Sequence, residues 1–289
     1  MTPDDYCYKL AAPPGSDFRY SLLGLPLARR QALIAVKAFE VEVTQIVDQC
    51  QNSSVARAKL DWWRDEIGRL FVDKPQHPVT LALQPYISTC NLPEEYFREI
   101  SDGAAMDVDV GAYPSFSELS LYAHRRGSIP TLLAAEILNY RNRRGTPRFA
   151  HDAGLMLLLF ELLYEVRRHA QLGRVYLPED EMQRYDIRPS DLLAAQTTER
   201  LRRLFAAQAE RIRDVHQRAL RQLSDEDRYA QYPLLIRLEL ALALLAEIAE
   251  DGYRLLEQRI QLTPVRKLWL AWRLRRREKQ PYRPSTVTE

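Results

Sequence analysis

The chain has 289 residues and a formal net charge of +2, so its overall charge argues neither for nor against a nucleic-acid partner. Leu, Ala, Glu and Arg dominate while Gly numbers only 10, which favours helices, because these residues lose little side-chain freedom on a helix. The three cysteines are widely spaced and form no CxxC pair, which excludes the common cysteine metal motifs. We expect unpaired thiols in a reducing compartment.

The N-terminus, MTPDDYCYKLAAPPGSDF, lacks the features of a targeting segment. It is acidic, has no apolar core and is not rich in arginine, unlike signal and transit peptides. No run of eighteen uncharged apolar residues occurs, so we expect no transmembrane helix. We therefore expect residues 1–17 to be an N-terminal extension of a cytoplasmic protein that lies peripherally on the inner face of the membrane.

Apolar residues recur at helical spacing along nearly the whole chain, and proline-containing breaks divide it into helix-sized segments. This pattern predicts helices over residues 28–51, 55–72, 79–89, from 93 onward, 115–140, 148–170, 190–223 and 232–260. No stretch alternates with period two for long, so we expect no strands. The sequence predicts one all-α domain, a multi-helix bundle over residues 18–262.

Residues 263–280 form a distinct basic segment, in which PVRKLWLAWRLRRREKQ carries seven Lys or Arg and one Glu. One helical stripe holds Val265, Leu268, Trp269 and Trp272. A basic amphipathic helix with tryptophans can lie in a membrane interface. The residues expected to contact the membrane are Trp269, Trp272, Arg273 and Arg276. The alternative is that the stripe docks on the protein and the arginines are solvated. We expect residues 281–289 to be disordered.

Four stretches, taken in order, resemble blocks of the squalene/phytoene synthase family, all-α prenyltransferases that join two isoprenoid diphosphates head to head. They read FRYSLLGLPLARRQALIAVKAFEVEVTQIVD, LDWWRDEI, LPEEYFREISDGAAMDVDVGAYPSFSELSLYAHRRGSIP and AGLMLLLFELLYEVRRHAQLGRVYLPEDEM. The last contains GRVYLP at 173–178, similar to the family's G-R-x-Y-L-P. The resemblance implies a helical bundle of the isoprenoid synthase type around a central cavity, which residues 155–163 and nearby tyrosines would line.

The family's chemistry implies two facing aspartate-rich helices that hold Mg²⁺, and the ions hold the substrate diphosphates. Here Thr44 and Asp48 stand where the first block has two aspartates. Glu161, Glu165 and His169 stand where the last block has an asparagine, an aspartate and a final aspartate. Thr44 has no carboxylate, and His169 is a poor ligand for Mg²⁺, which prefers oxygen. These degenerate positions predict that Mg²⁺-dependent diphosphate activation is lost.

Other positions match the family's architecture or replace its polar residues. The residues expected to contact substrate or line the cavity are Arg30, Tyr122, Tyr164, Arg174 and Tyr176. Trp62, Trp63 and Arg64 have acidic neighbours, so we expect a core-packing tryptophan with a structural arginine there, and no nucleic-acid partner.

We therefore expect a catalytically inactive, lipid-binding or assembly-type protein, similar to a degenerate subgroup that includes a mitochondrial complex I assembly factor. Its partners would be an isoprenoid or other lipid in the cavity, a membrane surface and a respiratory-complex subunit, with no cofactor. The alternative is an active, divergent prenyltransferase that uses Mg²⁺ to condense farnesyl or geranylgeranyl diphosphate.

A third interpretation is a transition-metal site. Glu161, Glu165 and His169 recur at intervals of four residues, and Asp48 lies on the helix expected to face them. Carboxylates and histidine on facing helices can hold such metals. The competing interpretation, which we favour, is that these residues pair with Arg167, Arg168 or other nearby arginines.

Overall fold

The computed structural model describes residues 1–50 and 52–279. Its α-helices are α1 (Pro3–Ala11), α2 (Asp17–Ser21), α3 (Leu27–Gln49), α4 (Ser53–Phe71), α5 (Pro78–Thr89), α6 (Glu94–Asp109), α7 (Phe116–Ala123), α8 (Ile129–Leu138), α9 (Gly145–Tyr164), α10 (Val166–Gln171), α11 (Glu179–Arg184), α12 (Glu199–Gln222), α13 (Asp225–Arg228), α14 (Tyr232–Glu250) and α15 (Pro264–Glu278). A π-helical turn, η1 (His124–Ser128), joins α7 to α8, and a 3-10 turn, η2 (Pro189–Leu193), follows α11.

The described residues confirm the expected all-α class. Their β-structure is limited to one isolated bridge, between Ala112 and Val175. The three cysteines are free, as expected. None of the described helices is both long enough and apolar enough to cross a bilayer. The expected disordered tail, 281–289, lies outside the described residues.

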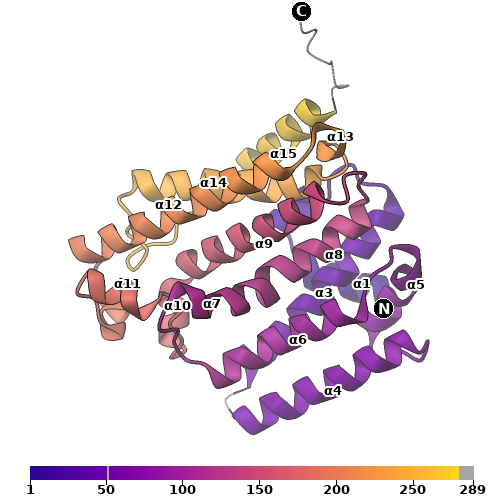
Figure 1. The fold of residues 1–289 in the computed structure, drawn as a ribbon, viewed down its shortest axis with the longest axis horizontal. Helices are drawn as coiled ribbons and strands as arrows, with labels where there is room; N and C mark the ends of the chain where they lie inside the picture. Colours follow the sequence, from indigo (N-terminus) through magenta and orange to yellow (C-terminus); the bar gives the residue numbers. More distant parts are fainter. Residues whose placement is uncertain (51, 280–289) are drawn as a thin grey trace, which may run out of the picture.

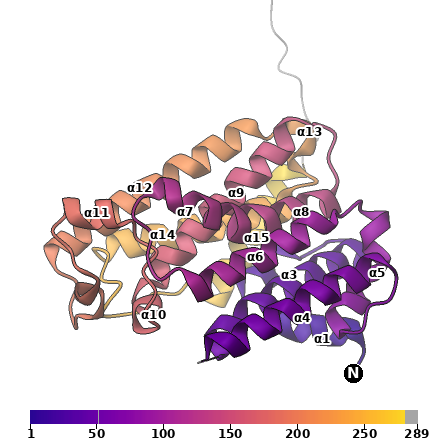
Figure 2. The ribbon, with the colours of Figure 1, turned by 60° about the horizontal axis from the view of Figure 1, so that its bottom comes forward.

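The long helices lie side by side in a bundle (Figure 1). Helices α4 and α6 form one edge, α3, α8 and α9 the middle, and α12, α14 and α15 the opposite edge. Helix α9 packs against α8, η1, α12 and α14, which explains why its sequence is apolar on most sides. Seen from below, α1 lies beside α3 and α5 (Figure 2), and its Cys7 is buried, so the expected N-terminal extension contributes a packed helix.

Two predicted helices were each wrong at one end. The segment expected over 190–223 is helical as α12 only from Glu199, where the Thr198 side chain accepts a hydrogen bond from the N–H of Leu201. The segment expected over 232–260 ends at Glu250, because Gly252 and Tyr253 adopt positive φ angles of 72° and 57°, which end a right-handed helix. Local caps therefore overrode apolar periodicity.

The helix expected over 148–170 is interrupted between α9 and α10. Glu165 has a ψ angle of 14°, outside helical geometry. The Tyr164 hydroxyl donates to the backbone carbonyl of Ile260, and Arg259 pairs with Glu165. Contacts with a distant segment thus coincide with the break. The apolar periodicity along residues 148–170 cannot predict such contacts.

Gly127 in η1 and Gly154 in α9 let two backbones approach closely. A Cβ built on Gly154 would lie 2.2 Å from the carbonyl oxygen of Gly127, and one on Gly127 would lie 2.6 Å from that of Gly154. Only glycine fits at this crossing. The contact holds η1 against α9 and so fixes Arg126, which precedes Gly127, beside the cavity described next.

Candidate functional site

Two adjoining chambers form the expected cavity. We call the first, of about 420 Å³, the apolar chamber; it lies between α2, α3, η1, α9 and α14. The second, the polar chamber, is about 430 Å³ and lies between α3, α6, α7 and the segment from α9 to Tyr176. Both are lined by Lys37, Glu40, Arg126 and Glu161. The shared charged residues therefore stand where the two chambers meet.

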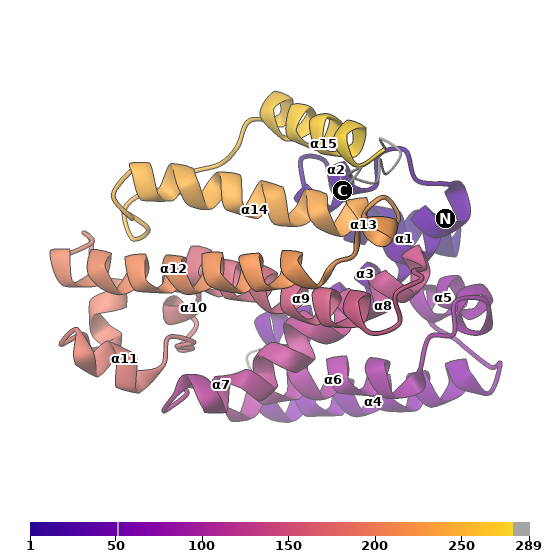
Figure 3. The same ribbon diagram turned by 45° about the horizontal axis from the view of Figure 1, so that its top comes forward.

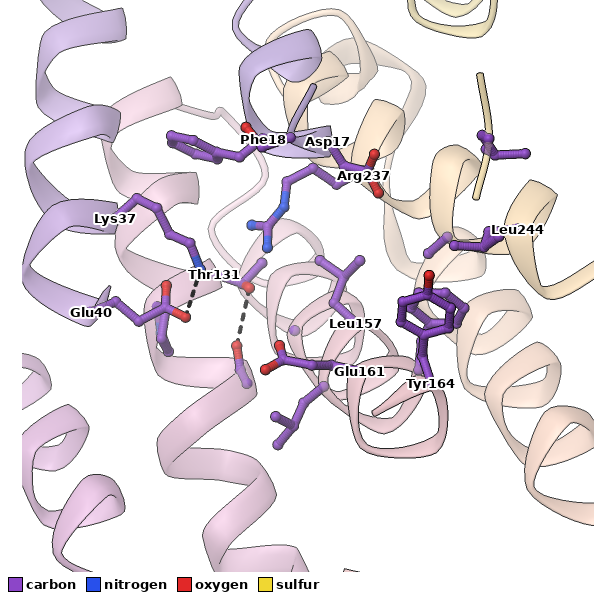
Figure 4. A pocket seen from close by; sticks show the side chains of 18 of the residues that line it. Asp17, Phe18, Lys37, Glu40, Thr131, Leu157, Glu161, Tyr164, Arg237 and Leu244 are labelled. Atoms are coloured by element: carbon purple, nitrogen blue, oxygen red, sulfur yellow. Dashed lines mark hydrogen bonds and ion pairs between the residues drawn. The ribbon is translucent and has the colours of Figure 1, made fainter. Parts of the chain in front are cut away.

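The apolar chamber has walls suited to a hydrocarbon chain. Its apolar lining includes Phe18, Leu157, Leu158, Phe160, Leu244 and Leu262. Figure 4 shows Lys37 and Glu40 on one side, Tyr164 and Leu244 on the other, and the side chain of Arg237 extending between them. A pocket with an apolar body and a few charged groups at one end fits an amphipathic ligand.

Cations reach the chamber boundary from three separate elements. Lys37 Nζ lies 2.8 Å from the carboxylate of Glu40, one turn along α3. Arg126 comes from η1 and is nine-tenths buried; its Nε lies 3.9 Å from Asp107, and Nε and Nη1 have no hydrogen-bond partner among the described residues. Arg237 extends from α14 toward the same space (Figure 4). Buried guanidinium groups of this kind favour an anionic ligand.

The charged side chains at the chamber boundary shift one another's pKa values. Burial would raise the pKa of Glu40, but the charges of Lys37, Arg126 and Arg237 lower it overall. Burial opposes the charge on Arg126, but Tyr122 and nearby carboxylates raise its pKa above the usual value. For Arg237 burial dominates and lowers the pKa. Any ligand head group in the cavity would therefore meet fixed charges of both signs.

The polar chamber is organised around Asp107. The hydroxyl of Tyr176 donates to one of its carboxylate oxygens at 2.5 Å, and that of Tyr122 donates to the other at 3.2 Å. The two tyrosine rings stack with centroids 5.1 Å apart, and burial raises the pKa of both hydroxyls. The GRVYLP segment thus contributes Tyr176 as a buried hydrogen-bond donor.

His169 lies beside this cluster and is 8% exposed. Its ring packs edge-on against Tyr176, with centroids 4.9 Å apart, and its Nδ1 has no hydrogen-bond partner among the described residues. Burial, followed by the charges of Arg168 and Arg174, lowers the pKa of His169 to about 4. The imidazole is therefore neutral at physiological pH.

Arginines pair with two of the three carboxylates at the degenerate positions, Asp48 and Glu165. Arg168 donates two hydrogen bonds of 2.9 Å to Asp48, and Arg174 pairs with the same carboxylate. Arg168 Nε also lies 3.6 Å from Glu165, which pairs with Arg259 as well. Arg168 therefore lies between the carboxylates of the two helices that would have to share a metal.

The residues present do not fit the Mg²⁺ ions that the resemblance implies, nor the alternative transition-metal site. The described part of the chain has no group of three or more His, Cys, Asp or Glu side chains placed to hold a metal ion. Asp48, Glu161 and His169 all line the polar chamber, whereas Glu165 lines a separate hollow. Asp48 and Glu165 pair with arginines, and the break at Glu165 separates Glu161 on α9 from His169 on α10. Asp48 and Glu165 both pair with Arg168, as the competing interpretation expected.

Of the residues expected to contact substrate or line the cavity, all but Arg30 line one of the two chambers. Tyr122, Arg174 and Tyr176 line the polar chamber, and Tyr164 lines the apolar chamber. Arg30 is exposed and lines neither chamber, because it lies near the start of α3, about five turns before Asp48.

Thr44 and Glu165 are the remaining degenerate positions. Thr44 lines the polar chamber, but its hydroxyl donates to the carbonyl of Val41 in its own helix at 3.3 Å. Glu165 lines a separate hollow with Arg167, Arg168 and Arg259. Thr44 therefore presents only a neutral hydroxyl to the polar chamber, and Glu165 presents no carboxylate to it.

Sequence reasoning missed Lys37, Arg126 and Arg237. Arg237 carried a usable signal, since it is a cation within the apolar run YPLLIRLELALALL. A charged residue in a helix that is buried on most sides usually faces a partner or a cavity. Lys37 and Arg126 carried no comparable signal, because ordinary helix surfaces also hold such residues.

Comparison with known proteins identifies related sequences over most of the chain. A model described as squalene/phytoene synthase matches residues 11–266. The 15-cis-phytoene synthase of Synechocystis sp. is 26% identical over 282 residues, covering 93% of this chain and 84% of the relative. The phytoene synthase of Arthrospira platensis is also 26% identical, covering 91% of this chain and 89% of the relative.

Solved structures share the fold. A dehydrosqualene synthase crystallised with a ligand has a TM-score of 0.82 at 20% identity, with 96% of each chain covered. The squalene synthase HpnC from Alicyclobacillus acidocaldarius has a TM-score of 0.74 at 24% identity, covering 87% of this chain and 95% of that one. At these identities the likeness establishes the helical bundle and not the chemistry.

Proposed function

Since the chain belongs to the squalene/phytoene synthase family, we propose that it binds an amphipathic, isoprenoid-like lipid in the cavity without condensing prenyl diphosphates. The observation that carries the proposal is Arg168, which contacts both Asp48 and Glu165. A divalent cation between these helices would have to displace its guanidinium group.

The cavity itself supports lipid binding. Its apolar chamber can hold a hydrocarbon chain, and Arg126 and Arg237 can face an anionic head group without a metal. Departure of diphosphate requires strong compensation of developing negative charge, which metal ions normally supply. Two of the carboxylates that would hold such ions, Asp48 and Glu165, are paired with arginines here, which supports binding without turnover.

A second candidate is an active prenyltransferase that condenses farnesyl or geranylgeranyl diphosphate head to head. One specific observation favours it: relatives named phytoene synthase align with more than nine-tenths of the chain. This candidate requires Arg168 to leave Asp48 when substrate and Mg²⁺ enter. We treat it as the direct competitor of the first proposal.

The degenerate motifs also motivate a role in assembly. The chain would then act as a lipid-binding scaffold for a respiratory-complex subunit, similar to the inactive subgroup that includes a complex I assembly factor. Retention of a packed bundle around a cavity without a metal-binding cluster among the described residues supports a scaffold role. Affinity purification of the intact protein from its own cells, followed by mass spectrometry, tests this part.

One pair of measurements separates the two candidates. The purified protein is incubated with farnesyl or geranylgeranyl diphosphate, with Mg²⁺ or Mn²⁺ and with or without NADPH, and pyrophosphate and extracted lipids are assayed. Binding of the same diphosphates in EDTA is measured by calorimetry. The variants are Glu165→Ala, Arg126→Gln and, as a control, Glu210→Ala on the exposed face of α12.

The first proposal expects no turnover, together with metal-independent binding that Arg126→Gln weakens and Glu210→Ala leaves unchanged. Turnover that Glu165→Ala abolishes would overturn it in favour of the active enzyme. If the protein shows no turnover and binds neither diphosphate, both candidates are overturned and only the scaffold role remains.

A further inference from the structure

Helix α15 exposes the apolar stripe that the sequence singles out. The exposed fractions are 78% for Val265, 49% for Leu268, 50% for Trp269 and 54% for Trp272. The buried residues of α15 are instead Leu270, Ala271 and Leu274. At 100° per residue these two sets lie on opposite faces of the helix. The stripe therefore does not dock on the protein, which contradicts the alternative interpretation of this segment.

The body of the protein holds α15 with its stripe facing outward. Helix α15 packs on α14 and α2 (Figure 3). Arg273 pairs with Glu239 at 2.7 Å, and Arg266 pairs with Glu247, both on α14. Lys267 pairs with Asp17 at 2.7 Å. These ion pairs flank the buried apolar face, so the orientation of the helix is set by contacts that leave the stripe uncovered.

Cations lie directly against the exposed indoles. The guanidinium of Arg273 lies 4.4 Å from the ring centre of Trp269, and that of Arg276 lies 5.4 Å from that of Trp272. Arg276 lies on the same stripe, one turn after Trp272. The seven cations of residues 264–279 outnumber the carboxylates that they reach on α14, on α2 and within α15. The exposed face is thus both apolar and positively charged.

We propose that this stripe docks the protein on the surface of an anionic lipid bilayer. Tryptophan favours the interface between lipid and water because its ring is apolar and its N–H is polar. Each nearby cation adds attraction to anionic head groups. A folded protein partner would need a groove of complementary shape, whereas a bilayer requires only the two properties that the stripe has: apolar rings and positive charge.

Docking through α15 would also place the cavity at the membrane. Lys267, in the first turn of α15, lines the apolar chamber, as do Gln261 and Leu262 just before the helix. The Lys267 amine also donates to the carbonyl of Gly15 at 2.9 Å. The helix that carries the stripe therefore forms part of the chamber wall, and a docked protein would hold that wall next to the lipid. The surface is independent of whether the cavity binds or converts a lipid.

The test measures partitioning of the intact protein onto vesicles. Co-sedimentation compares phosphatidylcholine vesicles with mixed phosphatidylcholine–phosphatidylglycerol vesicles, and brominated lipids report tryptophan insertion by quenching. The variants are Trp269→Ser with Trp272→Ser, and Arg276→Gln. The control is Trp62→Ser, since Trp62 is 41% exposed on α4, at the opposite edge of the bundle. Circular dichroism verifies folding, which the exposed substitutions should preserve.

We expect binding to the anionic vesicles with quenching, at least about tenfold weaker partitioning for the double tryptophan variant, and severalfold weaker partitioning for Arg276→Gln. Trp62→Ser should bind as the wild type does. Absence of binding to anionic vesicles, or equal binding by the double variant, would overturn the proposal. So would a wild-type dimer in solution that the double variant makes monomeric, because the stripe would then contact a second copy.

Discussion

Both terminal nitrogens of Arg168 lie 2.9 Å from one carboxylate oxygen of Asp48, although the two residues are 120 positions apart. The same guanidinium reaches Glu165 through Nε at 3.6 Å. One arginine thus links the helices whose acidic residues a divalent cation would otherwise join. The arrangement stabilises the two carboxylates with a cation that belongs to the protein.

Replacing Arg168 should leave the fold almost as stable as before. Its side chain is 49% exposed, so solvent screens its ion pairs, and Arg174 remains on Asp48. We expect Arg168→Gln to change the free energy of unfolding by less than about 1 kcal/mol in urea titrations. Arg203→Gln on α12, in an exposed pair with Glu199, is the matched control. A loss several times larger would mean that Arg168 is a structural residue.

Divalent cations should not stabilise the wild-type protein. A metal that binds only the folded state raises Tm in proportion to the logarithm of its concentration over Kd. Because Asp48 and Glu165 are paired with arginines, we expect equal Tm values in millimolar Mg²⁺ or Mn²⁺ and in EDTA. Thermal denaturation followed by circular dichroism measures this. A rise in Tm that Glu165→Ala abolishes would support the active enzyme instead.

His169 should make the protein less stable in mild acid. Its pKa falls from 6.5 to about 4 on folding, mainly through burial, so the unfolded chain binds the proton more readily. The contribution of neutral His169 is full above pH 6.5 and is lost as the pH falls toward 4, a change on the order of 3 kcal/mol.

Urea titrations across that pH range give the free energy of unfolding at each pH. This free energy should depend less steeply on pH for His169→Gln than for the wild type, since glutamine does not titrate. The comparison between the two proteins removes the shared contribution of other ionisable groups. Identical slopes would show that folding does not shift the pKa of His169.

The crossing of η1 and α9 should tolerate no side chain. Gly154→Ala would place a Cβ 2.2 Å from the backbone oxygen of Gly127. Because the clash is with backbone, no side-chain movement can relieve it. We expect a loss of more than about 3 kcal/mol in unfolding free energy, or failure to fold. In contrast, Gly68→Ala in α4 places its Cβ 3.8 Å from Arg98, an ordinary contact.

That control should be neutral or stabilising by up to about 1 kcal/mol, because alanine is the better helix former. Denaturant unfolding of both variants makes the comparison. Comparable stability of the two variants would mean that η1 and α9 separate easily, and that the position of Arg126 is not fixed by their contact.

The sequence alone determined the elements and their family. Apolar periodicity located most helices, and the ordered motifs ending in GRVYLP indicated the bundle that the structure confirms. The stripe of Trp269 and Trp272 was also readable, because residues three and four apart share a helix face. These are local properties, decided by spacing along one segment.

Only the tertiary structure decided what the charged residues contact. Spacing placed Asp48 and Glu165 on their helices, but Arg168, Arg174 and Arg259 reach them across the bundle. The convergence of cations from α3, η1 and α14 at the cavity, and the outward direction of the α15 stripe, depend likewise on packing between distant segments. The interaction energy of two charges depends on their distance in space, so a charged residue pairs with whichever opposite charge folding brings within a few ångströms. Separation along the chain does not predict that distance.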